Sequence, residues 1–120
     1  MSNRVVITGM GTISPIGLDV ESTWESLLAG RSGIDYITLF DASQHETKIA
    51  GEVKGFDPNQ YIDRKEVRRM DRFTHFAIAA AVQALKQAGL TIGPDNADDI
   101  GCVIGAGIGG LTTLSSASRP

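Results

Sequence analysis

The sequence predicts an α/β fold with a largely parallel sheet, from two apolar runs and the helical periodicity between them. The runs are residues 4–8 (RVVIT) and 100–104 (IGCVI). Neither alternates apolar with polar residues, and this is typical of strands covered on both faces. Segments with helical periodicity separate the runs, and alternation of strand and helix favours a parallel sheet.

The first predicted helix follows a turn-rich loop. Asp19 is a suitable N-cap, and Gly30 can follow the last turn as a C′ residue. Helical spacing would bring one apolar face together: Val20, Trp24, Leu27 and Leu28. Residues 31–47 show no period and predict a loop, and residues 48–53 (KIAGEV) predict a short strand.

The second half of the chain predicts two more helices before the second run. Asp63 with Glu66 has the form of a capping box, with helical turns to about residue 70. A longer helix is expected over residues 72–88, stopped by Gly89. Its small alanine side chains predict close, deep packing of one face: Phe73, Phe76, Ala77, Ala80, Ala81, Ala84, Leu85 and Ala88. Residues 91–99 predict an acidic loop, and the run 100–104 should feed another helix.

Composition indicates a soluble globular chain, and we expect a cytoplasmic location. The 120 residues are 42% hydrophobic and 21% charged, with a net charge of −3. The single cysteine excludes an internal disulfide and suits a reducing compartment. The amino terminus does not look like a signal peptide, and no apolar stretch approaches the ~20 residues that span a bilayer.

A glycine-rich stretch raises the possibility of nucleotide binding. Gly105, Gly107 and Gly110 have the spacing G-x-G-x-x-G of a dinucleotide loop. Such a loop also needs an acidic residue about 20 positions later, which this chain lacks. A small dinucleotide-binding domain is therefore a minor alternative, and tight turns or close backbone approach explain the glycines better.

The cysteine and the histidines predict structural roles. Cys102 lies in the second apolar run, where burial would favour the neutral thiol. His45 and His75 have no partner at metal-ligand spacing, so packing or surface positions are expected for both.

A basic segment, residues 64–72 (RKEVRRMDR), holds five of the eleven Lys and Arg residues and two acids, a local charge of +3. Arg64, Arg68 and Arg72 have the spacing of one helix face. Such a stripe attracts an acidic partner or a phosphate, although a solvated helix face is the plain alternative. Nucleic acid is disfavoured, because the chain is acidic overall and no aromatic residues interleave the cluster.

Four stretches together resemble the start of a β-ketoacyl-acyl carrier protein synthase, most closely the elongating subtype II: VVITGMGTISPIG, TWESLLAGRSGI, KEVRRMDRFTHFAIAAAVQAL and IGCVIGAGIGG. The resemblance runs over residues 1–114, which implies an incomplete amino-terminal domain with a divergent tail at 115–120. It implies a thiolase-like fold, here its first strand-helix-strand-helix-strand part, and a homodimer. No cofactor is implied.

The resemblance also implies chemistry and site residues. Such synthases condense a cysteine-bound acyl thioester with malonyl-acyl carrier protein, and two histidines assist. Positions matching Lys65, Arg68 and Arg69 dock the acyl carrier protein, and the position matching Ile108 lines the acyl pocket.

The chain departs from that family in its catalytic residues. The nucleophile motif Ala-Cys-Ser or Ala-Cys-Thr is absent, Cys102 has the wrong context, and neither histidine matches the catalytic pair. We therefore expect the 120-residue chain to be inactive alone. Two other functions stay open: a non-catalytic carrier-binding fragment and a chain-length-type subunit. The short chain could reflect truncation, or an internal deletion or frame change, as the final ASRP suggests.

Overall fold

The computed structural model describes residues 4–118, and the chain divides into two units within that range. Residues 4–11 with 58–118 make one unit, and residues 12–57 make the other. Residues 1–3 lie outside the described range. So do residues 119 and 120, the end of the tail that is predicted to diverge from position 115.

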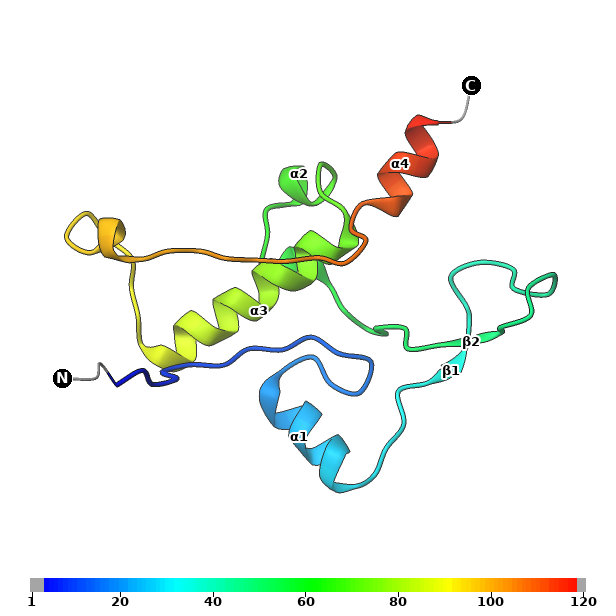
Figure 1. Cartoon of the computed structure of the whole chain (residues 1–120), viewed down its shortest axis with the longest axis horizontal. Coiled ribbons are helices and arrows are strands. Elements are labelled where there is room, and N and C mark those ends of the chain that lie inside the picture. Colours follow the sequence, from blue (N-terminus) through cyan, green and yellow to red (C-terminus); the bar gives the residue numbers. More distant parts are fainter. Residues whose placement is uncertain (1–3, 119–120) are drawn as a thin grey trace. The chain divides into compact units, whose positions relative to one another are not determined.

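The first unit is built on α3, Arg72–Ala88, which begins and ends where the periodicity predicts (Figure 1). Gly89 ends the helix with a left-handed φ of 63°, and its N–H donates to the carbonyls of Leu85 and Lys86. Glycine suits this position because it adopts the left-handed region without a steric penalty.

The alanine face of α3 permits the close approach that its composition predicts. The backbone at Gly9 and Gly11 lies directly on the helix, at Ala84 and Ala80 respectively. A Cβ at either glycine would overlap a carbonyl oxygen of α3. The predicted deep burial of the face is nevertheless wrong, because Phe73 and Ala81 are exposed and the buried residues of α3 are His75 and Ala79.

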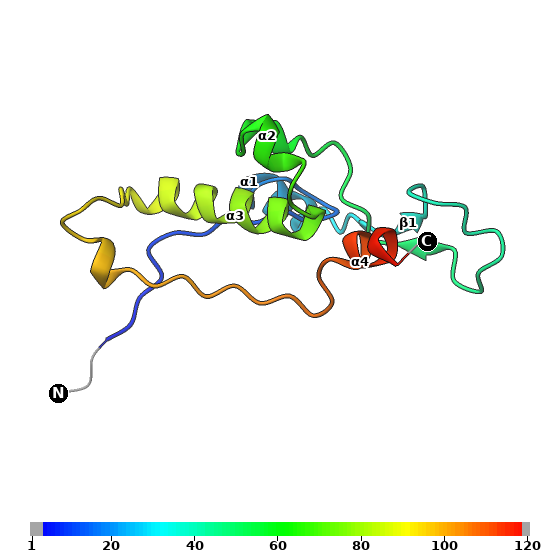
Figure 2. The same cartoon turned by 90° about the horizontal axis from the view of Figure 1, so that it is seen from above.

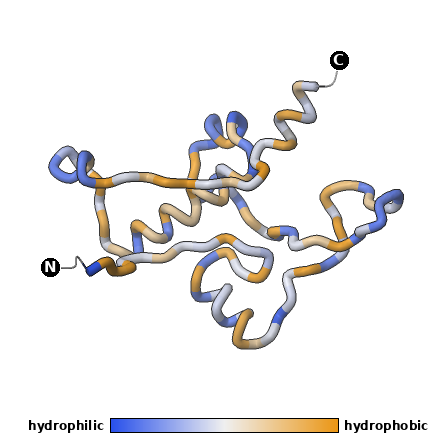
Figure 3. Tube along the Cα trace, viewed as in Figure 1, coloured by the Kyte–Doolittle hydropathy of each residue, from blue (hydrophilic) through white to orange (hydrophobic). Residues whose placement is uncertain are grey.

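The two predicted flanking strands are not formed, which corrects the expected parallel sheet. Residues 4–8 and 100–104 belong to no strand, although their traces are drawn out (Figure 2). Both contain stretches of hydrophobic residues (Figure 3), and Val5 and Val103 are 92% and 99% exposed. A strand exists only when a neighbour completes its hydrogen bonds. Among the described residues, the backbone hydrogen bond found for these runs joins the Ile100 N–H to the Ala97 carbonyl three residues earlier, which is a local turn and not a strand pairing.

Short elements complete the first unit. They are two single-turn helices, η1 (Pro58–Gln60) and η2 (Ala97–Asp99), and two α-helices, α2 (Arg64–Val67) and α4 (Leu111–Ala117). The helix expected after the second apolar run is therefore present as α4.

In the second unit, α1 spans Val20–Leu28, as the capping residues predict. The Asp19 carboxylate accepts a 2.7 Å hydrogen bond from the Ser22 N–H, and Gly30 follows the helix with φ 62°. The predicted apolar face is mostly uncovered, since Trp24, Leu27 and Leu28 are exposed. The capping hydrogen bonds join residues that are close in sequence, so they need no tertiary contact. Burial of the apolar face would require another segment to pack against it.

A small antiparallel sheet follows, in which β1 (Asp35–Tyr36) pairs with β2 (Ile49–Ala50). The predicted strand at 48–53 is thus shorter than expected, and β1 lies in a segment predicted to be loop. Among the described residues this is the one sheet, and its strands are antiparallel, whereas the sequence predicts a parallel sheet.

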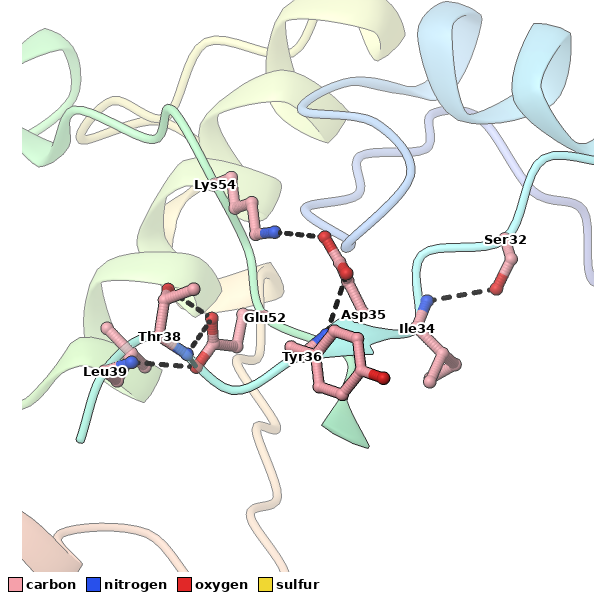
Figure 4. Close-up of polar contacts among 8 residues, drawn as sticks. All are labelled: Ser32, Ile34, Asp35, Tyr36, Thr38, Leu39, Glu52 and Lys54. Atoms are coloured by element: carbon pink, nitrogen blue, oxygen red, sulfur yellow. Dashed lines mark hydrogen bonds and ion pairs between the residues drawn. The ribbon is translucent and has the colours of Figure 1, made fainter. Parts of the chain in front are cut away.

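A buried carboxylate holds the sheet and the loop after it (Figure 4). Glu52 accepts hydrogen bonds from the Thr38 hydroxyl at 2.7 Å and from the backbone N–H groups of Thr38 and Leu39 at 3.0 and 3.1 Å. These bonds, that of the Thr38 side chain first, lower the pKa of Glu52 below its ordinary value. Nearby, Lys54 forms a 2.8 Å ion pair with Asp35.

Candidate functional site

The basic segment does not form one continuous helix, because α2 ends within it and α3 begins only at its last residue. Lys65 lies on α2, Arg68 is its C-cap, and Arg69 follows in a turn before α3 begins at Arg72. The predicted alignment of Arg64, Arg68 and Arg72 on one face is therefore wrong. The three residues predicted to dock a carrier protein are all exposed. We call Lys65, Arg68 and Arg69 the docking cluster.

A buried histidine ties the end of α2 to α3. His75 is 9% exposed, and its Nε2 lies 3.0 Å from the carbonyl oxygen of Val67. Because a carbonyl only accepts, the ring donates from Nε2. Of the packing or surface position predicted for His75, the structure shows the packed one. Its hydrogen bond to Val67, the residue before Arg68, was not predicted, since no sequence pattern marks a contact between residues eight positions apart.

The charged side chains of the basic segment differ in the interactions they make. Arg69 forms a 3.1 Å ion pair with Glu66, and the Arg72 guanidinium lies 5.0 Å from the centre of the Phe76 ring. Within the described residues, no ion pair involves Lys65 or Arg68. The predicted capping box is wrong, because Asp63 makes no side-chain cap bond and the Glu66 carboxylate binds Arg69 instead.

An open surface hollow lies over the start of α2 and is lined by Asp63, Arg64, Lys65 and Glu66. It mixes two bases with two acids and is not enclosed. The chemistry that this face offers is therefore exchange of salt bridges with charged groups of a partner, not encapsulation of a small molecule.

The residue predicted to line the acyl pocket lies in a turn before α4. Ile108 is 78% exposed, and we call residues 107–110 the pocket turn. Gly110 has φ 76°, and the position where a Gly109 Cβ would stand lies 2.8 Å from the Phe73 ring. The glycines of the run thus include one left-handed residue and one close packing contact, as expected of turns.

Two other candidates have plain surroundings. Cys102 is exposed, which corrects its predicted burial, because the run around it has no covering strand. His45 is exposed on the loop after β1 and packs edge-on to Phe40, with 5.5 Å between the ring centres. Among residues 4–118, no three His, Cys, Asp or Glu side chains gather as metal ligands. No helix in that range is long and apolar enough to cross a membrane.

Comparisons with known proteins agree on the family that this chain resembles. The model of the family described as "Beta-ketoacyl synthase, N-terminal domain" matches residues 2–120. A 3-oxoacyl-[acyl-carrier-protein] synthase 2 of Synechocystis sp. is 54% identical over 92% of this chain and 27% of its own length. One from Staphylococcus aureus is 52% identical over 98% of this chain and 28% of its own length.

A solved structure extends the likeness to three dimensions. "The ishigamide ketosynthase/chain length factor" has a TM-score of 0.70 and 43% sequence identity, over 76% of this chain and 23% of that one. The architecture is thus the thiolase-like one of ketosynthases, in part. The chain spans little more than a quarter of the length of the curated relatives it matches. On the extent of the family match and the identity of these relatives, the chain belongs to the β-ketoacyl synthase family, within its amino-terminal domain.

Proposed function

We propose that these residues are the amino-terminal, carrier-docking part of an enzyme that elongates fatty acids. That enzyme condenses an acyl thioester with malonyl-acyl carrier protein. Membership of the β-ketoacyl synthase family and relatives named 3-oxoacyl-[acyl-carrier-protein] synthase 2 support the reaction class. Its substrates are acyl and malonyl thioesters of the carrier protein.

The docking cluster carries the proposal for this chain. Lys65, Arg68 and Arg69 are exposed within a segment of charge +3, in a chain whose net charge is −3. A localised positive patch on an acidic protein attracts an acidic partner and orients it. The His75 contact with Val67 holds this patch in a defined shape before a partner arrives.

The chain alone is proposed to be inactive in condensation. Its cysteine, Cys102, lies in a glycine-flanked apolar run without the context of the family's nucleophile, and its two histidines do not match the catalytic pair. An assay with acyl and malonyl carrier protein should give no 3-oxoacyl product. Product formation would overturn this part of the proposal.

In the longer protein, residues 4–8 and 100–104 would become central strands of the sheet of a homodimeric, cytoplasmic enzyme. The supporting observation is that both runs are mostly apolar and largely exposed, which suits strands that layers would cover on both faces. The boundary at residue 114 and the divergent tail remain predictions.

A chain-length-type subunit is the second candidate, because the similar solved structure is named as a ketosynthase/chain length factor. Such a subunit keeps the architecture without the nucleophile. The intact mass and sequence of the native gene product in its own host would separate the two, since the enzyme requires a cysteine in the Ala-Cys-Ser or Ala-Cys-Thr context.

Charge reversal tests docking directly. The double variant Arg68→Glu/Arg69→Glu should weaken binding of an acidic acyl carrier protein by on the order of tenfold or more, and added salt should weaken the unmodified chain. The matched control Arg31→Glu/Lys86→Glu changes net charge equally at exposed positions outside the cluster. Equal affinity of the two double variants would refute the docking role.

A further inference from the structure

The pocket turn is held by residues that directly follow the docking cluster. Phe73, in the first turn of α3, lies against Gly109, where a Cβ would stand 2.8–2.9 Å from three atoms of the ring. Only glycine fits so close to the ring without displacing it. The turn that carries Ile108 therefore rests on the amino-terminal end of α3.

Asp71 makes the second contact. It is the N-cap residue of α3, yet its side chain makes no capping bond to that helix. Its Oδ1 instead accepts a 2.7 Å hydrogen bond from the Thr113 hydroxyl, 42 residues along the chain on α4. Its Oδ2 lies 3.0 Å from the position that a Cβ of Gly110 would take.

Because the Asp71 carboxylate binds Thr113, α3 lacks the side-chain capping hydrogen bond that an aspartate at this position can make. Aspartate is among the best N-cap residues, because its carboxylate can accept a hydrogen bond from an unpaired N–H of the first helical turn. Asp19 makes such a bond to Ser22 on α1. Asp71 forgoes it and binds α4, so its carboxylate serves the junction of α3 and α4 and not α3 alone.

We propose that Asp71 is a positioning residue that sets the pocket turn, and with it Ile108, against the start of α3. The proposal rests on the proposed function, because it takes Ile108 as the acyl-pocket residue. Asp71 is two residues from Arg69, so one short stretch both presents the docking cluster and holds the turn of the acyl pocket. The chain-length response at Ile108 then depends on the bond between Asp71 and Thr113.

The first test measures the geometry in the whole 120-residue chain. The unmodified chain should show an NMR nuclear Overhauser effect between the Phe73 ring and the Gly109 α-protons. Asp71→Ala and Thr113→Val each remove one end of the hydrogen bond and should abolish that signal. Asp71→Asn and Thr113→Ser keep an acceptor and a hydroxyl, and should preserve it.

The second test measures the consequence. Hexanoyl- and hexadecanoyl-carrier protein should shift the Ile108 δ-methyl signal differently in the unmodified chain, and Asp71→Ala should erase that difference. Carrier affinity should stay within about twofold, because the docking cluster is untouched. A persistent Phe73–Gly109 signal in Asp71→Ala and Thr113→Val would overturn the proposal, as would no chain-length difference in the unmodified chain. Failure of docking alone would appear separately, as equal affinity of the two charge-reversal variants.

Discussion

Residues 64–75 and the two apolar runs, 4–8 and 100–104, are held in opposite ways. The first segment is fixed by neighbours in sequence: Glu66 pairs with Arg69, and His75 reaches back to Val67. Among the described residues the apolar runs pair with no other strand, and apart from Ile100 their residues are exposed. The comparison teaches that the basic segment can take its local structure in a chain whose sheet is not formed, because helical turns close locally and strands do not.

The largest expected effect comes from disrupting the packing of the backbone after the first run on α3, which involves Gly9 and Gly11. Gly11→Val would drive a side chain into the carbonyl of Ala80 and lower the free energy of unfolding by about 1–3 kcal/mol. Urea unfolding followed by circular dichroism measures it. Gly107→Val is the matched control, since nothing lies within 4 Å of a Cβ there. Equal losses in both variants would contradict packing of this backbone on α3.

Removing the histidine contact tests the locally held segment. His75→Leu deletes the donor to the Val67 carbonyl, and we expect a loss of about 1 kcal/mol in stability. Carrier affinity should fall severalfold, because the docking cluster loses its fixed shape. Titration calorimetry reads the affinity. His45→Leu alters an exposed ring and should change neither quantity, so a similar loss of affinity there would remove the basis for a role of His75.

The bounds of α3 could be read from sequence, and the sheet could not. Asp71 and Gly89 flank the helix with residues that favour its ends, and every backbone partner lies within four positions. β1 was missed because residues 35–36 have no periodicity; Glu52 organises the loop that follows them, from fourteen residues away. The docking cluster was predicted as a set of residues, but the break between Val67 and Arg72 was not, because the His75 contact with Val67 spans eight residues and matches no helical spacing.

Lowering the pH should release the contacts of Glu52 with Thr38 and Leu39. Hydrogen bonds from Thr38 lower the pKa of Glu52 from its ordinary value of 4.5. The stability they provide is therefore complete above the pKa of the unfolded chain and is lost as the pH falls through the folded value. The NMR shifts of the Thr38 and Leu39 amides should report this, and Glu52→Gln should abolish their pH dependence. An unchanged pH profile in that variant would assign the titration to another group.

The smallest effect should come from Glu66, which pairs with Arg69 and would compete with the proposed partner for it. Their ion pair is exposed and spans 3.1 Å, and pairs of this kind contribute roughly 0.2–1 kcal/mol. Glu66→Gln frees the guanidinium and raises the charge of the basic segment by one unit. Carrier affinity should rise about two- to fivefold, with a steeper dependence on salt. Glu46→Gln removes an exposed acid outside the basic segment and controls for net charge. A gain of the same size there would mean that overall charge, not release of Arg69, governs docking.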